Sequence, residues 1–253
     1  MHWCLGMYGS ASTWTFNVVQ KLAAVLVPDR PVAAHFVNDS LDEVDPSAGT
    51  LVVKTHATLL GEELARRARA IIITIRDPRD SLASLLAHNK VPLDIALNVI
   101  EASARISARY ATHQRAMLFR FDDRFFDDPA TISKLATTFD GALSDADQAR
   151  IFAETRRDEI DNFIATMEAR PTATTYFNEL TGHEDTLDEV TGWHKHHAGR
   201  KGEDGRWRHE LSQSQVVAVE LRLRKWMERF GYPPETPPPP PYILSVGRYG
   251  ITT

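Results

Sequence analysis

The first half of the chain alternates short apolar segments with longer segments of helical periodicity. Five segments have the length and the apolar or β-branched composition of buried strands: residues 2–7, 32–37, 51–54, 70–75 and 117–121. Apolar side chains at helical spacing predict helices over residues 13–27, over 58–69 and through Ser84 and Leu85. Strands that alternate with helices predict an α/β fold, in which a central, mainly parallel sheet lies between two helical layers.

The second half of the chain has a different pattern. Helical periodicity covers residues 129–139, 144–167 and 211–230. The polar stretch 170–208 is longer than a plain connection, so it is predicted to be a binding loop or a lid. The prolines at 237–241 form a stiff, extended run. We therefore predict one domain, residues 1–232, followed by a Pro-rich tail, residues 233–253.

Composition narrows the class of protein. The chain has 253 residues, of which 43% are hydrophobic and 25% charged, and a net charge of -5. It has no excess of positive charge to attract nucleic acid or an anionic membrane. A single cysteine, Cys4, excludes an internal disulfide and is typical of a reducing compartment. No apolar run approaches the roughly 20 residues of a membrane span, and the N-terminus lacks a basic signal region. These features predict a soluble, cytoplasmic protein without a transmembrane segment.

A turn of small residues between the first strand and the first helix is a candidate anion site. It reads Gly9-Ser10-Ala11-Ser12-Thr13. Backbone N–H groups and the helix N-terminus favour a phosphate there, and the hydroxyl groups can donate hydrogen bonds. The nucleotide-triphosphate P-loop is not matched, because its Gly and Lys would fall on Ala11 and Ser12. The three-glycine dinucleotide fingerprint is absent. Taken alone, the turn is also compatible with a plain strand–helix connection.

Three further clusters follow the turn along the chain. They are Lys54-Thr55-His56, Arg76-Asp77-Pro78-Arg79-Asp80 with Ser84, and the Gly-punctuated segment from Arg200 to Trp207. Together with the turn and Trp14, they resemble the motifs of sulfotransferases that use 3′-phosphoadenosine 5′-phosphosulfate (PAPS). The four matches occur in the order of that family and span residues 9–207.

This resemblance implies a P-loop-like sulfotransferase fold, PAPS as cofactor, 3′-phosphoadenosine 5′-phosphate (PAP) as its product, and no metal. It implies that His56 is the catalytic base and that Lys54 stabilises charge on the transferred group. The residues that it places around the cofactor are Gly9, Ser10, Ala11, Ser12, Thr13, Trp14, Arg76, Ser84, Phe121, Arg200, Lys201 and Gly202. Physical chemistry agrees for Arg76, because a guanidinium at the carboxyl end of a parallel strand can grip a phosphate with two hydrogen bonds.

Each of these residues also has a plainer interpretation. Arg76 could form an ordinary ion pair with Asp80, and Ser84 could bond back to its own helix. Trp14 lies at helical spacing and could belong to the core. His56 could be a packing histidine, and Arg200 with Lys201 could be a solvated charge run.

The sequence departs from the family at Gly9, where the family has Lys or Arg. Losing that cation should slow transfer unless Lys54, Lys195 or Lys201 replaces it. Two alternatives therefore stay open: a non-catalytic PAP/PAPS-binding protein, and a P-loop-like small-molecule kinase that would need ATP and magnesium.

Residues 194–197, His-Lys-His-His, lack the ligand spacing of a zinc site and are predicted to form a basic loop that meets an acidic cofactor or acceptor. The acceptor is predicted to be a small molecule, lipid or glycan, bound by residues 88–95 and 170–198. No nucleic acid partner is expected, and the oligomeric state is not predicted.

Overall fold

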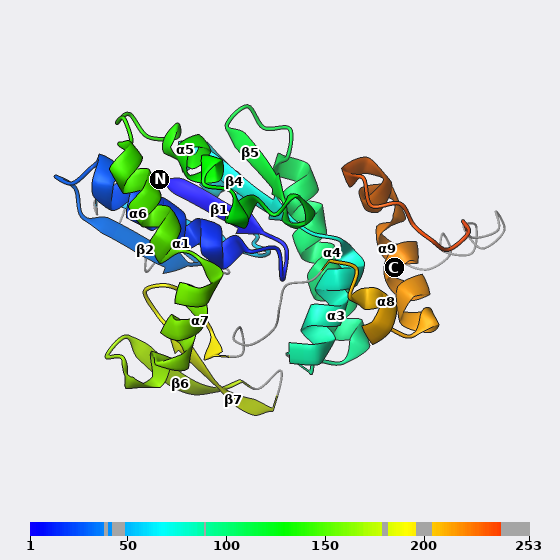
Figure 1. The fold of residues 1–253 in the computed structure, drawn as a ribbon. Helices are drawn as coiled ribbons and strands as arrows, with labels where there is room; N and C mark the ends of the chain where they lie inside the picture. Colours follow the sequence, from blue (N-terminus) through cyan, green and yellow to red (C-terminus); the bar gives the residue numbers. More distant parts are fainter. Residues whose placement is uncertain (38–39, 42–48, 89, 179–181, 196–203, 239–253) are drawn as a thin grey trace.

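A five-stranded parallel sheet forms the centre of the protein, as seen in a computed structural model that describes residues 1–37, 40–41, 49–88, 90–178, 182–195 and 204–238. The strand order is β2-β3-β1-β4-β5, and every neighbouring pair is parallel (Figure 1). The strands are β1 (His2–Gly6), β2 (Val32–Phe36), β3 (Thr50–Thr55), β4 (Ala70–Ile75) and β5 (Ala116–Arg120). All five were predicted from the sequence, to within two residues at each end.

Both faces of the sheet are buried under helices. In β1, Trp3 and Leu5 pack into one apolar cluster, whereas Cys4 packs into the other, because successive side chains of a strand point to opposite faces. The Cys4 face is covered by α1 (Ser12–Leu26), α5 (Ala130–Ala136) and α6 (Asp145–Glu154). The opposite face is covered by α2 (Gly61–Arg67), α3 (Pro78–His88), α4 (Leu93–Tyr110) and α9 (Gln213–Phe230). The predicted three-layer α/β/α fold is confirmed.

Two helical segments differ from the prediction. The helix α4 was not predicted; its 18 residues bury Leu97, Ile100 and Ala104 on one face. The single helix predicted over residues 144–167 is two helices, α6 and α7 (Arg157–Ala165), followed by the 3₁₀ turn η3 (Met167–Ala169). The break falls at Thr155, whose hydroxyl bonds back to the Ile151 carbonyl at 2.8 Å.

The polar stretch 170–208, which was predicted to be a binding loop or a lid, contains regular secondary structure. It contains an antiparallel hairpin, β6 (Ala173–Asn178) and β7 (His183–Asp188), which lies beside α7 and apart from the central sheet (Figure 1). A short helix, α8 (Trp207–Glu210), ends the stretch. Two 3₁₀ turns, η1 (Phe121–Asp123) and η2 (Phe125–Asp127), follow β5.

The first residues of the predicted tail are attached to the domain. Glu220 on α9 accepts hydrogen bonds from the backbone of Glu235 and Thr236. Buried Arg79 pairs with Glu220 at 2.8 Å and also donates to the Pro233 carbonyl. Residues 233–236 therefore pack on α9 and on the start of α3. None of the helices in the described ranges is both long and apolar enough to cross a membrane.

Candidate active site

The turn between β1 and α1 lies at the carboxyl edge of the sheet and has an unusual backbone. Gly9 has φ +70° and Ala11, the N-cap residue, has φ +62°. A Cβ on Gly6 would lie 2.2 Å from Ser12 Cβ, so glycine lets the helix start close to the strand. No side chain caps α1 at Ala11. The first-turn N–H groups are thus arranged for an anion rather than for a capping side chain.

The Ser10 side chain forms hydrogen bonds within the protein. Ser10 Oγ donates to the Met7 carbonyl at 2.6 Å and lies 2.8 Å from Thr74 Oγ1. Its backbone N–H also donates to the Met7 carbonyl. Ser10 therefore shapes the turn, and its contact with a phosphate stays a prediction.

Lys54 brings a cation to this turn from β3. Its ammonium donates to Thr13 Oγ1 at 2.6 Å, and its side chain is buried. Burial lowers the pKa of Lys54 to about 8. Of the other two lysines named for this role, Lys195 is exposed and pairs with Glu168, and Lys201 lies outside the described residues. Of the three lysines, Lys54 is thus the one that the structure brings into contact with the turn.

His56 follows β3 and is oriented by the end of β1. Its Nδ1 lies 2.7 Å from the Gly6 carbonyl, and its ring stacks on Tyr8 at 4.2 Å. A carbonyl can only accept, so Nδ1 carries the hydrogen and Nε2 keeps a lone pair. Burial and then the charge of Lys54 lower the pKa of His56 to about 3. The imidazole is neutral at physiological pH.

Arg76, Ser84 and the turn lie together. Arg76 is only 3% exposed, its Nη1 donates to the Gly9 carbonyl at 3.1 Å, and its guanidinium lies 4.0 Å from the centre of the Phe121 ring. A Cβ on Gly9 would lie 3.5 Å from both Arg76 Nη1 and Ser84 Oγ. The structure thus gathers four of the predicted site residues. Asp80 lies 3.7 Å from Arg76, as the plainer interpretation expected, but both groups are buried.

Asp80 is a residue of the site whose role sequence reasoning missed. One carboxylate oxygen accepts from the Gly205 N–H at 2.8 Å and the other accepts from the Trp207 N–H at 3.0 Å. This attaches the end of the Gly-punctuated segment beside Arg76. The predicted residues Arg200, Lys201 and Gly202 themselves lie outside the described residues.

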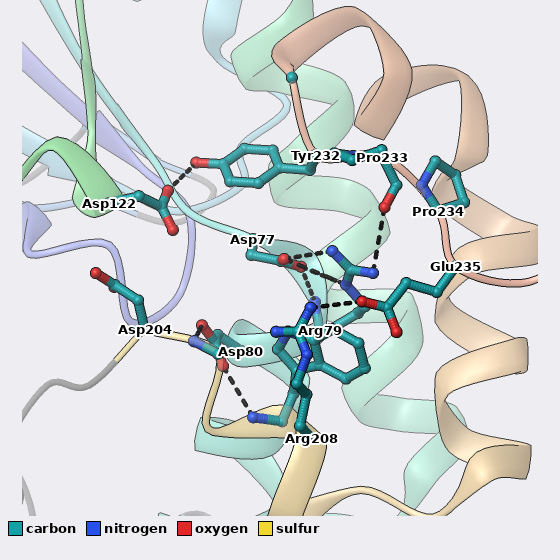
Figure 2. A pocket seen from close by; sticks show the side chains of 13 residues that line it. Asp77, Arg79, Asp80, Asp122, Asp204, Arg208, Tyr232, Pro233, Pro234 and Glu235 are labelled. Carbon is teal, nitrogen blue, oxygen red and sulfur yellow. Dashed lines mark hydrogen bonds and ion pairs between the residues drawn. The ribbon is translucent and has the colours of Figure 1, made fainter.

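Asp80 also lines a polar cavity of about 390 Å³ (Figure 2). Asp122 and Asp204 line it with Asp80, and within the described ranges the oxygens of these three carboxylates lie within 4.8 Å of one another. Their charges raise the pKa of Arg76 against the stronger lowering by burial. The negative charge of the three carboxylates therefore partly compensates the positive charge of the buried Arg76 guanidinium.

Trp14 is a core residue in this structure. It is 4% exposed, its indole N–H donates to the Thr155 carbonyl at 2.9 Å, and its ring meets Phe125 edge-on at 5.7 Å. This agrees with the plainer interpretation that Trp14 belongs to the core, and its place beside the cofactor stays a prediction. Trp14 also lines a second cavity of about 470 Å³, together with Phe163 and Trp193.

Comparisons with known proteins give the fold. No protein-family model matches the sequence, and a search of curated proteins finds no match. Mouse sulfotransferase SULT7A1 complexed with PAP superposes with a TM-score of 0.60 at 12% identity, covering 90% of this chain and 84% of that one. Retinol dehydratase with retinol and PAP gives 0.58 at 13% identity, covering 94% and 83%. Retinol dehydratase with androsterone and PAP gives 0.58 at 13%, covering 95% and 82%. The chain therefore has the P-loop-like α/β/α fold of these structures solved with PAP, as the resemblance of its motifs to sulfotransferases predicts.

Proposed function

We propose that this protein is a sulfotransferase that moves a sulfuryl group from PAPS to a hydroxyl or amine of a small acceptor. One observation carries the proposal: Arg76 and Ser84 meet the uncapped turn at Gly9 from one side, and Lys54 reaches the same turn at Thr13 from the other. Two anion-binding groups on one turn suit a nucleotide with separate 3′-phosphate and 5′-phosphosulfate groups. The structures with the same fold, solved with PAP, support this.

The described residues suggest how the donor would be held. The first-turn N–H groups of α1 would bind the 5′-phosphosulfate, with help from Lys54. Arg76 would grip the 3′-phosphate with two of its N–H groups, and Ser84 would add a third hydrogen bond. The Phe121 ring lies against the Arg76 guanidinium in a cation–π contact, which would help to fix the position of the guanidinium. Residues Arg200, Lys201 and Gly202 stay predictions for the same phosphate.

Transfer would then depend on positioning and charge. The acceptor oxygen or nitrogen attacks sulfur, the bond from sulfur to the 5′-phosphate oxygen breaks, and PAP leaves. The Lys54 ammonium would stabilise negative charge on the transferring group. Nε2 of His56 would accept a hydrogen bond from the acceptor. His56 is also the residue that the resemblance to sulfotransferases implies as the catalytic base. With a pKa of about 3, His56 can accept that hydrogen bond but retains a proton weakly. No metal is needed for these steps.

The surroundings of His56 favour an acceptor with an apolar body. Phe36 is 49% exposed, and its ring centre lies 5.8 Å from that of His56. Sequence reasoning missed this residue because an aromatic residue at a strand end is not distinctive. Retinol dehydratase was solved with retinol and with androsterone, both apolar molecules that bear oxygen. We propose a small phenol or alcohol as acceptor and a soluble, cytoplasmic enzyme.

Calorimetric titration with PAP, beside ATP, in metal-free buffer tests the proposal. We expect PAP to bind and ATP to bind much more weakly, because ATP lacks the 3′-phosphate. Binding of ATP with magnesium, and no binding of PAP, would favour the kinase instead. Binding of PAP without transfer to any phenol or alcohol would favour the non-catalytic binding protein.

A further inference from the structure

A histidine–carboxylate pair lies on the segment that follows the β6–β7 hairpin. His194 Nδ1 is 2.7 Å from Asp185 Oδ2, and the side chains are 25% and 10% exposed. The Tyr176 hydroxyl on β6 points to the same carboxylate oxygen at 3.4 Å. The pair is thus partly buried but reachable from solvent.

A tight turn after β7 brings the two residues together. Asp188 ends β7, and its carboxylate accepts from both the N–H and the hydroxyl of Thr191. The backbone then closes through bonds from Gly192 to Asp188 and from Asp188 to Trp193. His194 pairs with Leu187 in an antiparallel bridge. Asp185 lies two residues before Leu187 on the same face of the strand, so it is the diagonal neighbour of His194.

The same turn is attached to the start of α1, where the anion site lies. Asn17 donates to the Thr191 carbonyl at 2.8 Å. A Cβ on Gly192 would lie 3.9 Å from both Thr13 and Phe16. Thr13 is the residue that holds Lys54. The charge of His194 also contributes, after burial and the charge of Lys54, to lowering the pKa of His56.

We propose, resting on the proposed function, that His194 backed by Asp185 takes the acceptor's proton, while His56 orients the acceptor through a hydrogen bond. As the acceptor oxygen bonds to sulfur, its hydrogen moves to Nε2 of His194 and the electrons of the breaking S–O bond leave with PAP. A carboxylate on Nδ1–H fixes the tautomer that exposes Nε2 and stabilises the imidazolium that forms. His56 has a neutral carbonyl in that position instead.

The charged and titratable groups around His194 come from several elements. Asp185 and Tyr176 belong to the hairpin, His56 and Lys54 to the end of β3, and Lys195 pairs with Glu168 next along the chain. Asp185 contacts the imidazole directly. A purely structural role for the pair would hold the hairpin without affecting proton transfer, and the test must separate these roles.

Two acceptors that differ in acidity separate them. Phenol, like a tyrosine side chain, stays protonated up to about pH 10 and needs a base, whereas 4-nitrophenol is largely ionised at about pH 8 and does not. At that pH, His194→Gln should lower kcat for phenol by about 100-fold or more and change kcat for 4-nitrophenol by less than about threefold. Asp185→Asn should show the same selectivity with a smaller loss. The matched control, His183→Gln, changes an exposed histidine of β7 and should change neither rate.

Each outcome bears on the inference. Retained phenol transfer in His194→Gln would overturn it, and so would equal loss with both acceptors. PAP affinity of His194→Gln should match that of the unmodified protein. If the unmodified protein binds PAP but transfers to neither acceptor, the proposed function and this inference both fail. If it transfers to both and His194→Gln behaves identically, only this inference fails.

Discussion

Two residues of the β1–α1 turn take the left-handed backbone conformation, and only one of them is glycine. Gly9 has φ +70° and Ala11 has φ +62°. An L-residue pays about 1–2 kcal/mol for this conformation because its Cβ approaches the following carbonyl. Ala11 is both the strained residue and the uncapped N-cap of α1. An anion bound at this turn would offset the unfavourable free energy of the strained backbone.

Ala11→Gly should therefore stabilise the protein by about 1 kcal/mol, measured as the free energy of unfolding in urea. The same substitution at Ala24, an exposed position inside α1, is the control. Ala24→Gly should destabilise by about 1 kcal/mol, since glycine lowers helix propensity. The same sign for both variants would contradict the strain argument.

Because the pKa of Lys54 is low, the pH profile of the proposed reaction should have an alkaline limb, in which activity falls as the pH rises. Burial lowers this pKa to about 8, so the protonated fraction in the free protein falls as the pH rises through about 8. The kcat/KM for PAPS should fall with it, because that constant reports groups of the free enzyme. Lys54→Met should be slow and should lack this limb, whereas Lys225→Met, an exposed lysine on α9, should keep it. A limb that persists in Lys54→Met would assign it to another group.

Sequence reasoning found the turn and Lys54 because they lie at or just after the ends of predicted strands. It could not predict all the hydrogen bonds of Ser10 and Trp14, because each has a partner that is far away in sequence. Ser10 meets Thr74 across the sheet, and Trp14 meets Thr155 from another helix. Residue type and spacing indicate which residues gather at the carboxyl edge. The hydrogen bonds that commit a side chain to the fold depend on packing.

At the scale of elements, the five strands of the central sheet were predictable from the sequence and the two strands of the hairpin were not. β4 is an uninterrupted β-branched run with both faces covered. β6 and β7 carry threonines and charged residues, and Thr175 faces Thr186 as a cross-strand pair. Such a hairpin looks like a polar loop in composition. α4 was not predicted, although Leu97, Ile100 and Ala104 form a buried apolar face at helical spacing.

The capping box at the start of α9 allows the contribution of a helix cap to stability to be measured. Ser212 accepts from the Gln215 N–H, and the Gln215 side chain accepts from the Ser212 N–H, which together form a capping box. Ser212→Ala should destabilise the protein by about 1 kcal/mol in urea unfolding. Gln213→Ala alters the neighbouring exposed position without touching the box, and should stay within about 0.5 kcal/mol. Equal effects would mean that the cap adds nothing to stability.

At the scale of the whole molecule, the site joins elements that lie far apart in sequence. Arg79 pairs with Asp77 and with Glu220 of α9, and its guanidinium lies 4.1 Å from the centre of the Trp207 ring. Asp80 holds Gly205 and Trp207 by their backbone N–H groups. The first turn of α3 thus connects the proposed phosphate site with the C-terminal helices. The sequence motifs identified the residues of this turn, but they did not predict that Arg79 and Asp80 contact α8 and α9.

The 3′-phosphate assignment can be tested against this buried network by comparing PAP with 5′-AMP, which lacks the 3′-phosphate. Arg76→Ala should lower PAP affinity by about 100-fold and leave 5′-AMP affinity nearly unchanged, because only PAP loses charge-assisted hydrogen bonds. Removing Arg76 also leaves Asp80 without its cation, so folding must be checked by thermal unfolding. Ser84→Ala supplies a milder variant, with about a tenfold loss for PAP alone. Arg105→Ala, an exposed arginine of α4, is the control and should affect neither ligand. If the preference for PAP over 5′-AMP survives in both Arg76→Ala and Ser84→Ala, the 3′-phosphate lies elsewhere on the carboxyl edge of the sheet.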